Sequence, residues 1–197
     1  MVNEETAVRL QSDEELIASF QQGKTEAFNL LVGRYKDQLM NYVFRYLGDY
    51  DQADDVVQET FIRVYRKKEL YKPVAKFSTW LYTIATNLAK TQLRRRQRHA
   101  IFSLSRRKEN NHEEDYNIPD ASSATDSHAD SVLKQEIIQK ALDSISPKYR
   151  EVIVLCDIQE LTYEEICEIT GLNMGTVKSR LNRGRLQLQN LLKEIRD

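Results

Sequence analysis

Residues 160–185 read ELTYEEICEITGLNMGTVKSRLNRGR, and this stretch decides the fold that the sequence predicts. Thr162, with Glu165 three positions later, forms a capping-box pattern in which the hydroxyl and the carboxylate each satisfy a free amide at a helix start. Gly171 is typical of the left-handed residue that ends such a helix, and Asn173 is placed to cap a second one. Two helices joined by a tight, glycine-containing turn are the helix-turn-helix pattern.

The second of these predicted helices carries hydroxyl and cationic side chains away from its apolar stripe. The stripe includes Val177 and Gly184, and we expect it to pack on the first helix. Arginine can bond guanine with two hydrogen bonds in the major groove, and flanking cations suit phosphates. The absence of acidic residues between Ile169 and Leu192 favours duplex DNA binding over an ordinary charged surface. The predicted DNA-reading residues are Thr176, Ser179, Arg180 and Arg183 on the polar face, with Lys178 and Arg185 on its flank.

Charge is segregated along the 197 residues although the net charge is only −1, which excludes a generic polycation. Residues 101–131 hold 3 Lys or Arg against 7 Asp or Glu and few apolar side chains, so they cannot bury a core of their own. The sequence therefore predicts an all-α protein of two small domains, residues 12–98 and 132–197, joined by an acidic flexible linker at 99–131. The second is expected to be a four-helix domain. No signal peptide or long apolar run occurs, so we expect a cytoplasmic protein without membrane insertion.

An acidic patch is predicted on the helix that Asp51 should cap and that should run to about Lys68. Acidic residues in a first helical turn favour the helix dipole, which explains part of the pattern. The patch extends beyond that turn, however, and an acidic surface would repel phosphate while attracting a basic protein partner. Both explanations remain open from the residues alone. The patch consists of Asp54, Asp55, Gln58 and Glu59.

A second nucleic-acid surface is predicted in the tract from Leu70 to Lys108, which has 39 residues, ten Lys or Arg and no acid. Aromatic side chains beside a cationic track are typical of single-strand binding, because bases stack on rings while cations follow the backbone. Ser78 should cap the helix in this tract. Trp80 and Phe77 fit a base-stacking role or a core role. The predicted surface comprises Tyr71, Lys72, Trp80, Thr83, Asn87, Lys90 and Arg94.

Four blocks give the chain a resemblance to a known family. They are DDVVQETFIRVY at 54–65, FSTWLYTIATN at 77–87, LTYEEI at 161–166 and GTVKSR at 175–180. Together, in this order, they resemble the extracytoplasmic-function (ECF) sigma factors, the small two-domain class of bacterial RNA polymerase initiation factors.

The resemblance implies roles for the parts of the chain. The first domain would recognise and open the −10 promoter element, with Tyr71, Lys72 and Asn87 near a flipped base. Asp55 and the neighbouring patch would bind the polymerase clamp helices. The second domain would read the −35 element, the linker would run toward the RNA exit path, and an anti-sigma factor is an expected partner.

Two other functions share some of these features. A response-regulator-type repressor or activator would use a similar helix-turn-helix, as a dimer on duplex DNA. An RNA-binding module could use residues 70–108 alone. We expect no enzymatic activity, catalytic residue, metal or cofactor, since RNA polymerase itself would carry out the chemistry.

Overall fold

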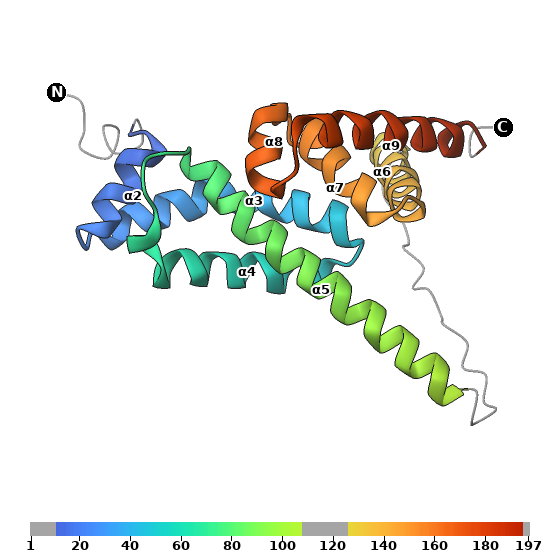
Figure 1. Ribbon diagram of the computed structural model, residues 1–197, viewed down its shortest axis with the longest axis horizontal. Coiled ribbons are helices and arrows are strands. Elements are labelled where there is room, and N and C mark those ends of the chain that lie inside the picture. The colour runs from blue at the N-terminus through green and yellow to red at the C-terminus, as the bar shows by residue number, and fades with distance from the viewer. Residues whose placement is uncertain (1–10, 108–125, 195–197) are drawn as a thin grey trace.

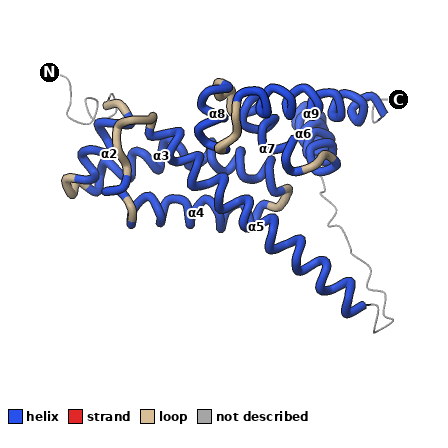
Figure 2. The backbone as a smooth tube through the Cα atoms, viewed as in Figure 1, coloured by secondary structure: helices blue, strands red, loops and turns tan. Residues whose placement is uncertain are grey.

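The computed structural model describes residues 11–107 and 126–194, and within these ranges every regular element is a helix (Figures 1 and 2). The all-α prediction is therefore confirmed for the described residues. The first domain consists of α2 (Asp13–Gln21), α3 (Thr25–Leu47), α4 (Tyr50–Arg66), the 3-10 turn η1 (Lys68–Leu70) and α5 (Phe77–Arg107).

Local caps explain where the helices of the first domain begin and end. The predicted capping box at Ser12 is present, and Gly48 ends α3 with a φ of 72°. The N-cap of α4 is Asp49, whose carboxylate accepts a hydrogen bond from the Gln52 amide at 3.0 Å. The expectation that Asp51 caps this helix is wrong by two residues, because both aspartates fit an N-cap and only the backbone geometry separates them.

The second domain has the predicted four helices. They are α6 (Asp126–Ser144), α7 (Pro147–Ile153), continued by the π-helical turn η2 (Val154–Ile158), α8 (Tyr163–Thr170) and α9 (Met174–Glu194). Thr162 and Glu165 form the reciprocal capping box, and Gly171 ends α8 with a φ of 71°. Asn173 Oδ1 accepts a hydrogen bond from the Thr176 amide at 2.8 Å. The helix-turn-helix is thus built as the sequence predicts.

The apolar stripe of α9 was expected to pack on the first helix of the helix-turn-helix, but it also packs on α7. A Cβ atom at Gly184 would lie 2.5 Å from Ile153 Cδ1 and 3.1 Å from Tyr149 Cβ, both on α7. Val177, two turns nearer the start of α9, is fully buried. Gly184 therefore permits the close approach of α9 to α7, which holds the helix-turn-helix on the rest of its domain.

The two domains pack against each other. Figure 1 shows α8 beside the first part of α5, and α6 and α7 over the later part of α3. The buried apolar side chains of both domains form one continuous cluster. Arg150, itself buried, donates a hydrogen bond to the Tyr46 carbonyl at 3.0 Å across this boundary. We call this packing the closed arrangement.

The predicted linker, residues 99–131, is helical at both described ends. α5 continues to Arg107, and α6 begins at Asp126. Residues 108–125 lie outside the described residues, so the rest of this expectation stays untested. None of the helices in the described ranges has the length and apolarity needed to cross a membrane.

Candidate polymerase and nucleic-acid interfaces

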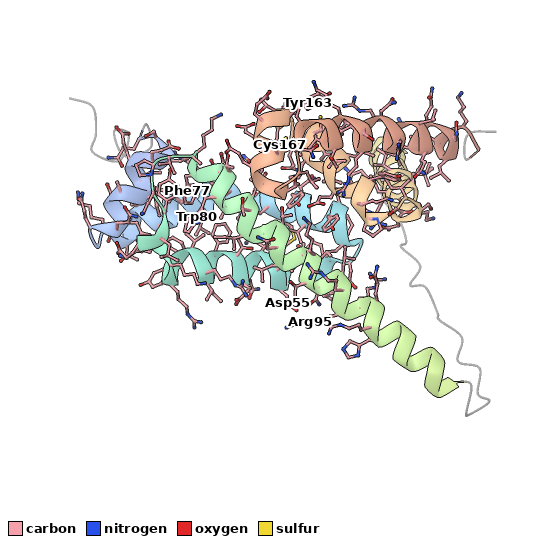
Figure 3. All side chains as sticks on the ribbon, viewed as in Figure 1. Asp55, Phe77, Trp80, Arg95, Tyr163 and Cys167 are labelled. Atoms are coloured by element: carbon pink, nitrogen blue, oxygen red, sulfur yellow. The ribbon has the colours of Figure 1, made fainter. Side chains whose placement is uncertain are left out.

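The acidic patch occupies an exposed face of α4. The side chains of Asp55 and Gln58 are exposed, while Asp54 and Glu59 are half-buried. Gln58 Nε2 donates to Asp54 Oδ2 at 2.6 Å, and Glu59 pairs with Arg63 at 2.8 Å. In Figure 3, Asp55 lies at the edge of the molecule opposite the labelled Tyr163 of α8. The closed arrangement therefore leaves this surface open to a partner.

Two exposed apolar side chains continue the same face of α4. Ile62 and Tyr65 are 42% and 50% exposed and follow Asp55 and Gln58 at helical spacing. An apolar centre beside an acidic rim is typical of a protein interface. The sequence prediction missed these two residues because they look like ordinary core positions in an amphipathic helix.

Four of the six predicted duplex-reading residues line a hollow of about 380 Å³ at the start of α9. Its walls include Thr176, Ser179, Arg180 and Arg183, as the sequence predicts. Lys148 and Tyr149 of α7 complete it, although no pattern in the sequence indicated them. Lys148 Nζ lies 4.9 Å from the centre of the Tyr149 ring. Lys178 is exposed beside the hollow.

The arginines on this surface differ in their surroundings. Arg183 shares the hollow with Tyr149, and its guanidinium lowers the pKa of that tyrosine. Arg185 is held by Asp157, with Nε 3.0 Å from Oδ2 and Nη2 2.5 Å from Oδ1. This pairing raises the pKa of Arg185. A phosphate contact by Arg185, as predicted, would have to replace the Asp157 carboxylate.

The aromatic end of the predicted single-strand surface is largely internal. Tyr71 is 6% exposed, and its ring centre lies 5.9 Å from that of Phe77 and 5.5 Å from that of Trp80. Its hydroxyl donates to the Ala75 carbonyl at 2.9 Å, within the same loop. Burial raises the pKa of Tyr71. Phe77 is a core residue, whereas Trp80 packs on both rings and stays half-buried (Figure 3).

The polar part of the predicted surface follows α5. Lys72, Asn87 and Arg94 are exposed, so a ligand can reach them in this arrangement. Thr83 is half-buried and its hydroxyl donates to the Thr79 carbonyl at 2.7 Å. Lys90 Nζ lies 2.6 Å from Glu151 Oε1 of α7, so this lysine already has a partner in the second domain.

Other contacts also bring the second domain onto the single-strand surface. Lys76 Nζ lies 2.8 Å from Glu165 Oε1 of α8, and the pairing raises the pKa of Lys76 and lowers that of Glu165. Tyr82 donates to Gln159 Oε1 at 2.7 Å. The sequence offered no signal for these pairs, because their members lie 77 or more residues apart. The closed arrangement thus covers part of the surface that a single strand would need.

No cluster of His, Cys, Asp or Glu in residues 11–107 and 126–194 is arranged to hold a metal ion. Cys156 and Cys167 are both free thiols and half-buried.

Comparison with known protein families matches both domains separately. Residues 31–99 match Sigma-70 region 2, and residues 135–188 match Sigma-70, region 4.

Several curated proteins are similar over most of the chain. The ECF RNA polymerase sigma factor SigW of Bacillus subtilis is 36% identical over 195 residues, covering 91% of this chain and 96% of its own length. The ECF RNA polymerase sigma-E factor of Escherichia coli is 34% identical over 185 residues, covering 93% and 96%. SigE of Mycolicibacterium smegmatis is 38% identical over 177 residues, covering 89% of this chain and 65% of its own length.

Two solved structures share the fold over most of the chain. CnrH in complex with the cytosolic domain of CnrY aligns with a TM-score of 0.70 at 23% identity, covering 93% of this chain and 99% of CnrH. The sigma factor RpoE in complex with the anti-sigma factor NepR from Bartonella quintana aligns with a TM-score of 0.64 at 28% identity, covering 84% and 96%.

Proposed function

The chain belongs to the extracytoplasmic-function class of bacterial sigma factors, and we propose that its two domains divide promoter recognition between an intact groove and a separated strand. The observation that carries this conclusion is the match to SigW over 96% of that protein's length, which includes both domains. A sigma factor binds core RNA polymerase and directs it to promoters, so the polymerase supplies the active site. We infer that the chain acts in the cytoplasm and has no enzymatic activity of its own.

Core polymerase binds the exposed face of α4 in this proposal. Asp54, Asp55, Gln58 and Glu59 supply acidic and polar contacts to a basic surface, and Ile62 with Tyr65 supplies apolar area. The support is that this face of α4 stays exposed in the closed arrangement, whereas Lys90 of the proposed −10 surface is paired with Glu151 of the second domain. Polymerase can therefore bind before the DNA-reading surfaces are engaged.

The start of α9 reads the −35 element in the major groove. Arg180 and Arg183 approach base edges from the hollow, and Lys178 approaches the phosphate backbone. Lys148 of α7 adds a further cation to the walls of the hollow. The balance of base contacts and phosphate contacts gives this domain specificity as well as affinity.

The −10 element is bound as a single strand by the loop at residues 71–76 and by α5. Extruding a base costs a few kcal/mol, and stacking on an aromatic side chain recovers roughly 1–3 kcal/mol per base. Trp80, which is half-buried beside Tyr71, is the aromatic side chain available for stacking, while Lys72, Asn87 and Arg94 contact backbone or base edges. Lys90 joins them only after it leaves Glu151. Opening of the closed arrangement is therefore part of promoter binding.

We infer that an anti-sigma factor is a further partner. The support is that the RpoE structure, which shares this fold at 28% identity, is a complex with the anti-sigma factor NepR. The response-regulator alternative has no support among these relatives, which are sigma factors over nearly their whole length.

Reconstituted transcription tests the proposal. Core bacterial polymerase with the purified chain should start transcripts from a subset of a genomic promoter library, and polymerase alone should not. Light scattering of the chain alone should give a monomer. A library without any chain-dependent start, or a dimer that binds duplex DNA without polymerase, contradicts the proposed function.

A further inference from the structure

The loop at residues 71–76, which leads into α5, is closed internally by two hydrogen bonds. The Val74 amide donates to the Lys72 carbonyl at 2.8 Å, and the Tyr71 hydroxyl donates to the Ala75 carbonyl. Val74 is 91% exposed. Two internal hydrogen bonds do not fix the conformation of such a loop. Its conformation therefore depends on the contacts made at its two ends. In the structure α2 contacts both ends, and Lys76 at the exit also pairs with Glu165 of α8.

The entry to the loop is fixed by Gln21 at the end of α2. Its Nε2 donates to the Lys68 carbonyl at 2.7 Å and to the Tyr71 carbonyl at 3.2 Å. A second bond runs from η1 back to α2. Lys68 Nζ donates to the Phe20 carbonyl at 2.7 Å and lies 4.4 Å from the centre of the Phe20 ring. One amide group thus binds the carbonyls on both sides of the turn at which the chain leaves η1.

The exit from the loop is fixed by Glu14 at the start of α2. Its Oε1 accepts a hydrogen bond from the Phe77 amide at 3.1 Å. Phe77 is the first residue of α5, so its amide has no partner within the helix, and a carboxylate there also interacts favourably with the helix dipole. Glu14 further lines a hollow of about 590 Å³ together with Pro73, Val74 and Lys76.

α2 is itself well anchored, so it can serve as a fixed base for the loop. The capping box of Ser12 and Glu15 holds its first turn. Asp13 accepts hydrogen bonds from Arg34, at 2.6 Å, and from the Tyr35 hydroxyl, both on α3. Leu16 is fully buried. The sequence match to Sigma-70 region 2 begins only at residue 31, so α2 lies outside it.

We infer that Gln21 and Glu14 are positioning residues for −10 recognition: they hold both ends of the 71–76 loop and so determine which base it accepts. This inference rests on the proposed function, since it concerns the surface assigned to the −10 strand. Neither side chain needs to touch DNA. They act through Tyr71, Phe77 and the loop backbone between them.

Substitutions that remove the bonds but keep the packing test this inference in the full chain. Gln21→Met keeps the length of the side chain without its donor, and Glu14→Ala removes the acceptor. Glu14→Gln retains an amide oxygen that can accept from Phe77, so it should behave like the unchanged protein. Gln22→Met, at the next and exposed position, is the matched control.

The first measurement is the −10 base preference of the polymerase complex, read from transcription of a library randomised at both promoter elements. For Gln21→Met and Glu14→Ala we expect the ratio between the preferred and the poorest −10 base to fall about tenfold, as expected for the loss of one or two hydrogen bonds. The −35 preference should stay unchanged. A uniform fall in transcription with an unaltered −10 preference would mean that these residues only stabilise the fold, and it overturns the inference.

The second measurement is amide hydrogen exchange of residues 71–77 in the chain without polymerase. Exchange should accelerate at least severalfold in Gln21→Met and Glu14→Ala and stay unchanged in Glu14→Gln and Gln22→Met. Unchanged exchange in all four variants overturns the inference. If exchange responds as expected but the unchanged chain starts no transcript, the proposed function fails while α2 still holds the loop.

Discussion

Lys90 on α5 and Glu151 on α7 form an ion pair across the domain boundary, with Nζ 2.6 Å from Oε1. The Glu151 side chain is only 3% exposed and that of Lys90 is 25% exposed. A cation expected to follow the −10 strand is thus neutralised by the domain expected to read the −35 element. In the proposed function, Lys90 contacts the −10 strand only after this ion pair has broken.

Lys90→Met should shift the chain toward an open arrangement. The substitution leaves the Glu151 carboxylate buried without its cation, which costs several kcal/mol in a fully buried pair and about 2 kcal/mol here, since Lys90 is partly exposed. Separation of the domains returns the carboxylate to water. Small-angle X-ray scattering should show a larger radius of gyration for Lys90→Met than for Lys72→Met, an exposed lysine of the same surface. Identical scattering curves would argue against a role for the pair in closing the domains.

The contact between Lys76 and Glu165 should be insensitive to pH near neutrality. The pKa of Glu165 is lowered by its hydrogen bond with Lys76, so its contribution is present above its ordinary pKa of 4.5 and is lost as the pH falls through the lowered value. The pKa of Lys76 is raised by Glu165, so its contribution is present below 10.5 and is lost only above that. Energy transfer between dyes on the 71–76 loop and α8 should stay constant from about pH 5 to 10 and fall in more acidic solution.

A Lys76→Met variant supplies the control for that experiment, because it removes the hydrogen bond that lowers the pKa of Glu165. Its energy transfer should be lower at neutral pH and should lose the acidic step. An acidic step of the same size in both proteins would assign the transition to another carboxylate.

Gln58→Ala combined with Glu59→Ala should weaken binding to core polymerase about tenfold or more, because truncating central interface contacts costs 1–2 kcal/mol or more. Stability should change little, since the intrahelical partners of these side chains, Asp54 and Arg63, form surface contacts. Affinity for a −35 duplex should be retained. Equal loss of affinity in a polymerase pull-down and in a duplex titration would contradict the assignment of polymerase binding to α4 and of −35 binding to the second domain.

Arg180→Ala and Lys178→Ala should affect −35 binding in different ways. Loss of a base contact by Arg180 should cost about 1–3 kcal/mol at one position and relax the preference there. Loss of Lys178, which is exposed beside the hollow, should weaken binding to all sequences and reduce the salt dependence by about one counterion. Titration of a set of duplexes at several salt concentrations separates the two effects, and matching profiles would refute the assignment.

Gly184→Ala should destabilise the second domain by about 1–3 kcal/mol, because the added Cβ would lie 2.5 Å from Ile153 Cδ1 and 3.1 Å from Tyr149 Cβ. Gly33→Ala is the matched control, since nothing lies within 4 Å of a Cβ there and α3 is otherwise regular. It should stabilise the protein by about 0.5–1 kcal/mol. Thermal unfolding of both variants checks the opposite signs, and a neutral Gly184→Ala would show that α7 and α9 can move apart freely.

The sequence by itself determined the elements whose signals are local. The capping box at Thr162, the left-handed glycine at 171 and the cap at Asn173 all involve neighbours within a few residues, so their patterns specify the helix-turn-helix. Helical periodicity places four of the predicted −35 residues on one face, and the structure gathers these four around one hollow: Thr176, Ser179, Arg180 and Arg183.

Only the tertiary structure decided how the surfaces are used. The burial of Tyr71, the pairing of Lys90 with Glu151 and the hold of Gln21 on the 71–76 loop each join residues from different elements. Such contacts depend on how amphipathic helices pack against one another. The same local sequence pattern is compatible with a side chain that is exposed, buried or paired, so the pattern alone does not distinguish these outcomes. Periodicity therefore predicts which residues share a face, while packing alone determines what that face meets.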